Sequence, residues 1–64
     1  MKVGIIGCGF IGSELAHFID KVKNFELIGL NDIDKNKVND LIKDLRKNKP
    51  KFMEIDELIK KLVI

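Results

Sequence analysis

The sequence predicts an α/β fold with a parallel sheet, and three observations carry that prediction. A short, unbroken apolar run at Val3–Ile6 is typical of a central parallel strand covered on both faces. A helical pattern of apolar residues follows it. A second apolar segment, Phe25–Leu30, is then followed by another helical pattern. Strands that alternate with helices in this way favour parallel pairing through right-handed crossovers.

Between the first strand (residues 2–6) and the first helix lies the stretch Gly7-Cys8-Gly9-Phe10-Ile11-Gly12. Its glycines have the G-x-G-x-x-G spacing of a dinucleotide-binding turn. Gly7 permits a tight turn, Gly9 lets the backbone approach a pyrophosphate, and Gly12 lets the helix lie close to the strand. Free N–H groups at the helix N-terminus, together with the helix dipole, then favour an anion. The stretch therefore predicts a dinucleotide site.

The first helix is expected from about Ile11 to Val22, with Gly12 and Ala16 forming a small-residue face against the first strand. Its larger apolar side chains are expected to share one stripe, formed by Ile11, Leu15, Phe18, Ile19 and Val22. The polar side chains are expected on the opposite, solvated side, namely Ser13, Glu14, His17, Asp20 and Lys21. We assign no role to His17, and we expect Cys8 to act through packing.

The second strand ends at Asn31-Asp32, and Asp32 lies 20 residues beyond Gly12. A dinucleotide site needs a carboxylate at this distance to accept hydrogen bonds from the ribose hydroxyls. Asp34 is a good N-cap for a second helix that runs to about Leu45 or Lys47. The apolar face of that helix is expected to comprise Val38, Leu41, Ile42 and Leu45.

The last quarter of the chain predicts a short third strand at Phe52-Met53 and a short helix capped by Asp56 that runs to about Lys61. The apolar residues 62–64 are expected to open a fourth strand. Together the elements predict a partial Rossmann (doubly wound) fold in three layers, with parallel strands in a β-α-β-α-β sequence and a short last helix. Residues 1–64 are then the N-terminal part of a dinucleotide-binding domain.

Composition excludes several other classes of protein. The chain has 64 residues, 45% of them hydrophobic and 34% charged, which is typical of one small globular domain. A net charge of +2 favours no nucleic acid, and the basic stretch Arg46–Lys51 lacks the aromatic residues that stack on bases, so a solvated loop is expected there. No apolar run is long enough for a membrane span, and no signal peptide precedes the first strand. With a single cysteine, the expected location is cytoplasmic.

Residues 1–12, 25–32 and 55–58 resemble the N-terminus of the L-aspartate dehydrogenase family, and the likeness spans nearly the whole chain. The resemblance implies an oxidoreductase that acts on the CH–NH2 group of an amino acid with NAD or NADP. By position it implies cofactor-binding roles for Gly7, Gly9, Phe10, Ile11, Gly12 and Asp32. Family members are several times longer and carry the substrate pocket and the catalytic histidine in a second domain. That domain is absent here, so no catalytic or metal-binding residue is assigned.

Other interpretations stay open beside this one. The chain could be the NAD-binding part of a homoserine-dehydrogenase-like enzyme, a stand-alone dinucleotide-binding module or subunit, or a structural remnant without ligand. For the cofactor, a carboxylate at Asp32 favours NAD because it would repel a 2′-phosphate, and Ile33 supplies no arginine. NADP is the alternative, since Lys35 and Lys37 lie near enough in sequence to weaken that repulsion.

The strand order expected for the complete fold is 3-2-1-4, so a chain that stops at residue 64 leaves Val3–Ile6 as an edge strand. The run contains no charge, bulge or proline that would discourage pairing with another strand. The sequence therefore predicts self-association, or coverage of the edge by a missing C-terminal domain. The competing expectation is that the short last helix covers part of this edge.

Overall fold

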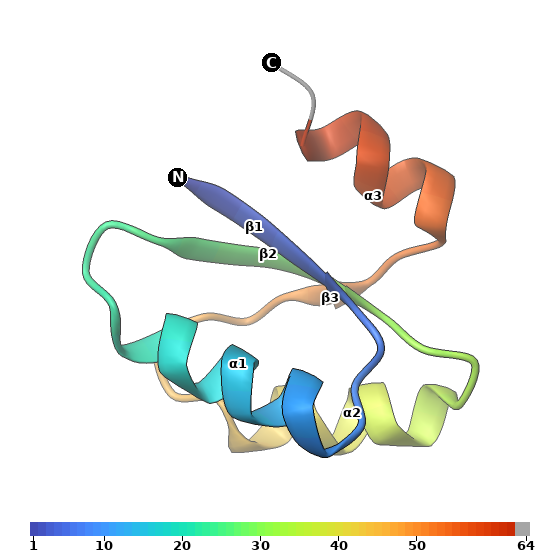
Figure 1. Ribbon diagram of the computed structural model, residues 1–64, viewed down its shortest axis with the longest axis horizontal. Coiled ribbons are helices and arrows are strands. Elements are labelled where there is room, and N and C mark those ends of the chain that lie inside the picture. The colour runs from blue at the N-terminus through green and yellow to red at the C-terminus, as the bar shows by residue number, and fades with distance from the viewer. Residues whose placement is uncertain (63–64) are drawn as a thin grey trace.

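The computed structural model describes residues 1–62, which form a three-stranded sheet with helices on both faces (Figure 1). In chain order the elements are β1 (Lys2–Ile6), α1 (Phe10–Lys21), β2 (Glu26–Asn31), α2 (Lys35–Asp44), β3 (Lys51–Phe52) and α3 (Ile55–Leu62). The strands are parallel and lie in the order β1-β2-β3. In Figure 1, α1 and α2 lie together on one face and α3 on the other. The predicted three-layer α/β arrangement of a partial Rossmann fold is confirmed.

The core lies between the sheet and the layer formed by α1 and α2. Its fully buried side chains come from all of these elements and include Leu27, Leu30, Val38 and Leu45. The side chain of Asp34 caps α2 by accepting a hydrogen bond from the Asn36 amide at 3.0 Å. The buried residues of α2 confirm its predicted apolar face. The helix begins and ends within a few residues of the expected positions.

The packing of α1 differs from the prediction. Its buried residues are Ala16, Ile19 and Asp20, whereas Ile11, Leu15 and Phe18 are exposed. The reason is the close approach of the helix to the sheet. A Cβ at Gly12 would overlap the carbonyl oxygen of Gly7, so the small-residue face of α1 turns inward and its bulky stripe points past the edge of the sheet. The small-residue face was predicted correctly. Of the predicted apolar stripe, Ile19 is buried in the core, whereas Ile11, Leu15 and Phe18 are exposed.

Asp20 was expected on the solvated side of α1, and the structure corrects this. Its buried carboxylate accepts hydrogen bonds from the amides of Arg46, Lys47 and Asn48 at 2.7 to 3.2 Å and from Asn48 Nδ2 at 2.9 Å. Asn48 is itself buried, and its Oδ1 accepts a hydrogen bond from the Leu27 amide at 3.2 Å. The backbone of the segment before β3 is therefore anchored to the end of α1 and to β2, while its basic side chains are exposed, as expected of a solvated loop.

Gly4 and Gly29, two strand residues without side chains, set the position of α3. Leu58 is buried over Gly4 of β1 and Gly29 of β2. A Cβ at Gly4 would lie 2.5 Å from Leu58 Cδ1, and one at Gly29 would lie 2.7 Å from the same atom. The absence of side chains on this face of the sheet lets α3 pack closely against it. Because α3 packs on the face of the sheet, it leaves the outer edge of β1 uncovered among the described residues.

Three further details concern the register, the sheet edge and the last helix. The register between β1 and β2 shifts between Val3 and Gly4, where β2 has the extra residue Ile28. β1 is an edge strand among the described residues and its Ile6 is exposed, which agrees with the predicted edge. In α3, Asp56 belongs to the first turn and Leu62 is helical where a fourth strand was expected. Residues 63–64 of that expected strand lie outside the described residues.

Candidate dinucleotide site at the carboxyl ends of the strands

The turn between β1 and α1 depends on one glycine with a left-handed backbone. Gly7 has a φ of 94°, a conformation that residues with a Cβ rarely adopt. Its amide donates a hydrogen bond to the Asn31 carbonyl at 2.8 Å, which holds the turn against the end of β2. The chain can therefore leave β1 and enter α1 within three residues.

Helix α1 begins with amides that no side chain of the described residues caps. Gly9 is its N-cap, and the Gly9 carbonyl accepts the first helical hydrogen bond, from the Ser13 amide at 2.8 Å. The preceding amides, including those of Phe10 and Ile11, have no acceptor within the helix. A Cβ at Gly9 would meet no atom within 4 Å, so nothing inside the chain requires a glycine there. This open, amide-lined space suits the close approach of an anionic group such as a pyrophosphate.

Asp32 follows β2 directly and reaches back to the glycine turn. Its Oδ2 accepts a hydrogen bond from the Cys8 amide at 2.7 Å, and its Oδ1 accepts one from the Asp34 amide at 2.9 Å. The hydrogen bonds from Asp34 and Cys8 hold the pKa of this carboxyl below its usual value, so the group is ionised at neutral pH. Each carboxylate oxygen can accept a second hydrogen bond, which leaves Asp32 able to bind hydroxyl groups.

Buried contacts of Cys8 and Asn31 hold the glycine turn, the end of β2 and the segment after β3 together. The Cys8 thiol is buried and makes a weak hydrogen bond to the Asn31 carbonyl at 3.6 Å. Burial raises the pKa of the thiol, and the negative charge of Asp32 raises it further. The Asn31 side chain is also buried and donates from Nδ2 to the Met53 carbonyl at 2.6 Å. Cys8 therefore acts by packing, as expected, and Asn31 ties β2 to the segment after β3.

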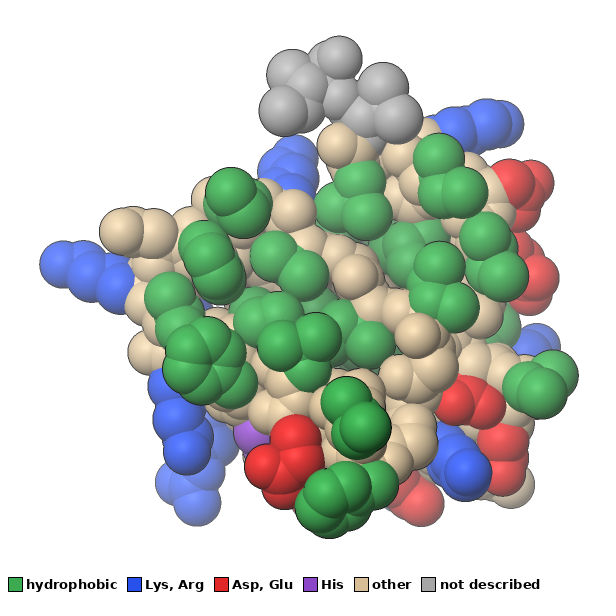
Figure 2. Space-filling view, viewed as in Figure 1, with side chains coloured by type: hydrophobic (Ala, Val, Ile, Leu, Met, Phe, Trp, Pro, Cys, Tyr) green, Lys and Arg blue, Asp and Glu red, His purple; other side chains and the backbone are tan. Residues whose placement is uncertain are grey.

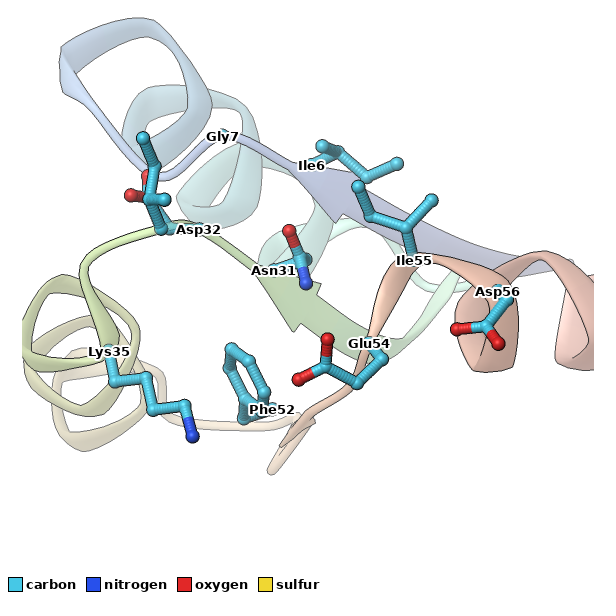
Figure 3. A pocket seen from close by; sticks show the side chains of 10 residues that line it. Ile6, Gly7, Asn31, Asp32, Lys35, Phe52, Glu54, Ile55 and Asp56 are labelled. Atoms are coloured by element: carbon cyan, nitrogen blue, oxygen red, sulfur yellow. The ribbon is translucent and has the colours of Figure 1, made fainter.

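A hollow of about 580 Å³ opens beside Asp32, where the carboxyl ends of all three strands meet (Figure 3). Its lining includes three acidic side chains, those of Asp32, Glu54 and Asp56. The ammonium of Lys35 lies 4.9 Å from the centre of the Phe52 ring, which forms another wall. In Figure 3 the Glu54 carboxylate points toward Phe52. The site roles of Phe52 and Glu54 were not predicted from the sequence, because the only signal was their position at the end of a two-residue strand and just after it.

Two other hollows lie along β1 and at the amino ends of the strands. One, of about 570 Å³, runs along the carboxyl half of β1 and the first turns of α1, and apolar residues such as Ile6, Ile11 and Leu15 line it together with the glycine turn. The other, of about 380 Å³, lies at the amino ends of the strands. Its lining includes Lys2, Lys47, Lys49, Lys51 and Lys61, with Glu26 as its acidic residue. Acidic and basic side chains therefore gather at opposite ends of the sheet.

The structure brings the predicted site residues together at one end of the sheet. Gly7, Gly9, Phe10, Ile11 and Gly12 form the turn and the first turn of α1, and Asp32 bonds directly to that turn. His17 lies further along α1, in a separate hollow beside Asp20. Within residues 1–62, no three His, Cys, Asp or Glu side chains are grouped so that they could hold a metal ion. No helix in this range is long and apolar enough to cross a membrane.

Comparison with known proteins gives a match along the whole chain. The model of the GFO/IDH/MocA family, an oxidoreductase family with an NAD-binding Rossmann fold, matches residues 1–64. Proteins named L-aspartate dehydrogenase from Methanosarcina barkeri and Methanosarcina mazei are each 45% identical to it over 60 residues, which is 92% of this chain. One from Methanosarcina acetivorans is 41% identical over 61 residues. The chain spans 22% of the length of each of these relatives. No solved structure gives a significant match.

Proposed function

The chain belongs to the oxidoreductase family with an NAD-binding Rossmann fold, and from this premise we propose that it supplies the adenosine side of a nicotinamide dinucleotide site. The uncapped amides at the start of α1, next to the open space at Gly9, are the observation that carries the proposal. In this proposal the amides of Phe10 and Ile11 donate hydrogen bonds to the pyrophosphate, and the helix dipole favours its charge.

The adenosine half of the ligand is assigned to the acidic hollow. The carboxylate of Asp32 accepts hydrogen bonds from the ribose hydroxyls through the lone pairs that the Cys8 and Asp34 amides leave free. Phe52 and the stem of Lys35 offer apolar surface for the adenine ring. When bound, the nicotinamide of such a cofactor carries a hydride to or from the substrate. In the complete protein we propose that this substrate is an amino acid such as L-aspartate, which is oxidised at the carbon that bears its amino group.

We propose that NAD is preferred over NADP. A 2′-phosphate on the adenosine ribose would approach three acidic side chains, Asp32, Glu54 and Asp56, and would be repelled by them. Lys35 is the cation among the residues that line the hollow, and its ammonium lies over the Phe52 ring. Lys37 lies near enough to contribute to the lowered pKa of Asp32, but it does not line the hollow. The balance of charge therefore opposes a second phosphate.

Calorimetric titration of the purified chain with NAD and with NADP tests this function. We expect NAD to bind at least about 10-fold more tightly than NADP, because a hydrogen bond to a charged group contributes about 1.5 to 3 kcal/mol. Asp32→Ala should weaken NAD binding about 10-fold or more and should remove the preference. Glu57→Ala is the matched control, since Glu57 is exposed in the first turn of α3 and does not line the hollow. Equal affinities for the two dinucleotides, or an unchanged preference in a folded Asp32→Ala variant, would contradict the proposal.

The uncovered edge of β1 belongs to the same proposal. We propose that further polypeptide covers it, either a second copy of this chain or a C-terminal domain of the kind that the longer relatives have room for. The relatives extend well beyond the matched segment, and the residues that would hold the nicotinamide and the substrate lie outside it in this proposal. The described residues then provide binding of the cofactor but not the chemistry of hydride transfer.

A further inference from the structure

One ammonium group lies in the acidic hollow at the carboxyl ends of the strands. Of the described residues that line this hollow, Asp32, Glu54 and Asp56 are acidic and Lys35 is the basic one. Figure 2 shows acidic side chains along the side of the molecule where α2 and α3 begin, with basic side chains among them. The position of the Lys35 charge therefore matters for any ligand that would bring a phosphate close to Asp32.

The Lys35 ammonium lies over the ring of Phe52. It is 4.9 Å from the ring centre, which is within the range of a cation–π contact. In Figure 3 the Lys35 side chain extends toward Phe52 and away from Asp32. Lys35 is the first residue of α2, and the first turn of that helix contains no acidic residue. Because a cation opposes the helix dipole at this end, the face of the ring is a more favourable position for the ammonium than the helix end.

The Phe52 ring is fixed independently of Lys35. It is partly buried and packs against the hydrophobic core. The Phe52 backbone pairs with Leu30 of β2, and the amide of the next residue, Met53, donates to the Leu30 carbonyl at 3.0 Å. The Met53 carbonyl accepts a hydrogen bond from Asn31 Nδ2 at 2.6 Å. The ring is therefore a rigid surface, whereas the exposed Lys35 side chain is long and flexible.

The electrostatics of Asp32 agree with this placement. Hydrogen bonds from two backbone amides, those of Asp34 and Cys8, lower the pKa of its carboxyl, and the charge of Lys37 lowers that pKa further. Lys35 lies nearer to Asp32 in the sequence than Lys37 does and lines the same hollow, yet its charge does not contribute to the lowering. The ammonium is therefore held where its field acts weakly on the carboxylate.

We propose that Phe52 is a positioning residue for the choice between NAD and NADP. Its ring holds the Lys35 ammonium away from Asp32, so the cation that lines the hollow is not available to a 2′-phosphate on the adenosine ribose. The inference rests on the proposed function, in which Asp32 accepts hydrogen bonds from the ribose hydroxyls. Without the ring, the flexible Lys35 side chain can pair with a 2′-phosphate, and NADP gains an ion pair that NAD lacks.

Calorimetric titration of the Phe52→Leu variant with both dinucleotides tests the inference. Leucine keeps an apolar side chain but has no aromatic face, so Lys35 is released. We expect the affinity for NADP relative to NAD to rise about 2- to 5-fold, which corresponds to the loss of an exposed cation–π contact. Lost contact with the adenine ring weakens both dinucleotides equally and cancels in this ratio. Phe52→Tyr retains the aromatic face and should keep the wild-type ratio.

Two lysine variants show whether the effect passes through Lys35. Lys35→Met keeps most of the stem and removes the charge. In this background Phe52→Leu should leave the ratio of NADP to NAD affinity unchanged, because no ammonium remains to be released. Lys43→Met is the matched control, since Lys43 lies in the last turn of α2, is exposed and does not line the hollow. In the Lys43→Met background, Phe52→Leu should raise the ratio as it does in wild type.

The chemical shift of the Lys35 ε-methylene protons reports the contact without any dinucleotide. The ring current of an aromatic side chain shifts protons above its face upfield. We therefore expect an upfield shift in wild type and in Phe52→Tyr, and the ordinary lysine value in Phe52→Leu. The wild-type measurement does not depend on the folding of any variant.

Three results would overturn the inference while NAD still binds the wild-type chain. They are an ordinary shift of the Lys35 protons in the folded wild type, an unchanged ratio in folded Phe52→Leu, and an equal rise of the ratio in the Lys35→Met background. Each of them leaves the proposed cofactor site in place. Failure of the wild-type chain to bind either dinucleotide would instead contradict the proposed function, and this inference would fail with it.

Discussion

At the scale of single residues, Asp20 determines where the segment before β3 lies. Burial raises the pKa of its carboxyl, but hydrogen bonds from Asn48, Arg46 and Lys47 outweigh burial and hold that pKa well below its usual range. A pKa that is lower in the folded state than in the unfolded chain stabilises the fold at all pH values above about 4, the ordinary value for aspartate. This contribution is lost as the pH falls below about 4 toward the pKa of the folded state.

We predict that Asp20→Asn lowers the free energy of unfolding at neutral pH by about 2 kcal/mol. The substitution turns an NH2 group toward backbone amides that need an acceptor, and it leaves at least one of them unpaired. Urea unfolding monitored by circular dichroism measures the change. Wild-type protein should also lose stability between about pH 4 and pH 2, and the variant should lose less of it over this range. Asp40→Asn, on the exposed side of α2, is the control. Equal stability of wild type and Asp20→Asn would show that the buried carboxylate is not needed.

At the scale of elements, the position of α3 depends on two strand residues without side chains. Leu58 fills the space above Gly4 and Gly29, and it is the buried residue of a helix whose other apolar side chains, such as Ile55 and Ile59, are largely exposed. The third layer is thus attached to the sheet through one main contact. Its stability should be sensitive both to the size of residue 58 and to any atom added beneath it.

We predict that Gly4→Ala destabilises the fold by about 1 to 3 kcal/mol through overpacking against Leu58. At a strand position without strain the same change would be neutral or stabilising, because alanine restricts the unfolded chain. In a Leu58→Ala background the space is free, so Gly4→Ala should cost about 1 kcal/mol less than it does in wild type. A double-mutant cycle by urea unfolding measures this coupling. Strictly additive changes in the free energy of unfolding would contradict this prediction. They would mean that α3 moves away from the sheet at no cost in stability.

At the scale of the whole molecule, the proposed cofactor cradle, formed by the glycine turn, the first amides of α1 and Asp32, lies at one end of the sheet and beside its free edge. The glycine turn follows β1 directly, and β1 is the strand whose outer side is uncovered in the described chain. Any group that is to approach the reactive end of a bound dinucleotide from that side must therefore come from further polypeptide or from a second copy of the chain. In the proposed function, binding and catalysis are separable because they depend on different parts of the complete protein.

We predict that the purified chain does not form NADH from L-aspartate and NAD. In the proposed site it provides amides and a carboxylate for the cofactor, but the described residues place no acid or base at a substrate site next to them. The absorbance of NADH in a steady-state assay is the measurement, with the full-length relative from Methanosarcina barkeri as the positive control. Measurable NADH formation that copurifies with the chain would contradict the prediction. It would indicate that association of several copies completes a catalytic site.

Much of the fold followed from local patterns in the sequence. The apolar runs located β1 and β2, and the helical period with Asp34 as the cap located α2. The G-x-G-x-x-G spacing identified the turn and the close packing of Gly12. These features depend on residues a few positions apart, so periodicity and turn chemistry were sufficient to predict them.

The features that were missed depend on residues far apart in the chain. From its local sequence, Asp20 is expected to be a solvated helix residue. It is buried because a loop 26 to 28 residues later in the chain packs against it. Periodicity located the apolar stripe of α1 but could not say which side of the helix faces the sheet, because the close approach at Gly12 decides that. The acidic hollow combines the ends of β1, β2 and β3 with the start of α3, so Phe52 and Glu54 carried no local signal.

The opposite charges at the two ends of the sheet have a consequence for the kinetics of encounter. Lysines gather at the amino ends of the strands, whereas Asp32, Glu54 and Asp56 gather at the carboxyl ends, where the cradle lies. A dinucleotide is an anion, so at long range the lysines attract it toward the amino ends of the strands, away from the cradle. The amides at the start of α1 attract it only at short range. Added salt screens this long-range field, so the bias toward the amino ends should weaken as the ionic strength rises.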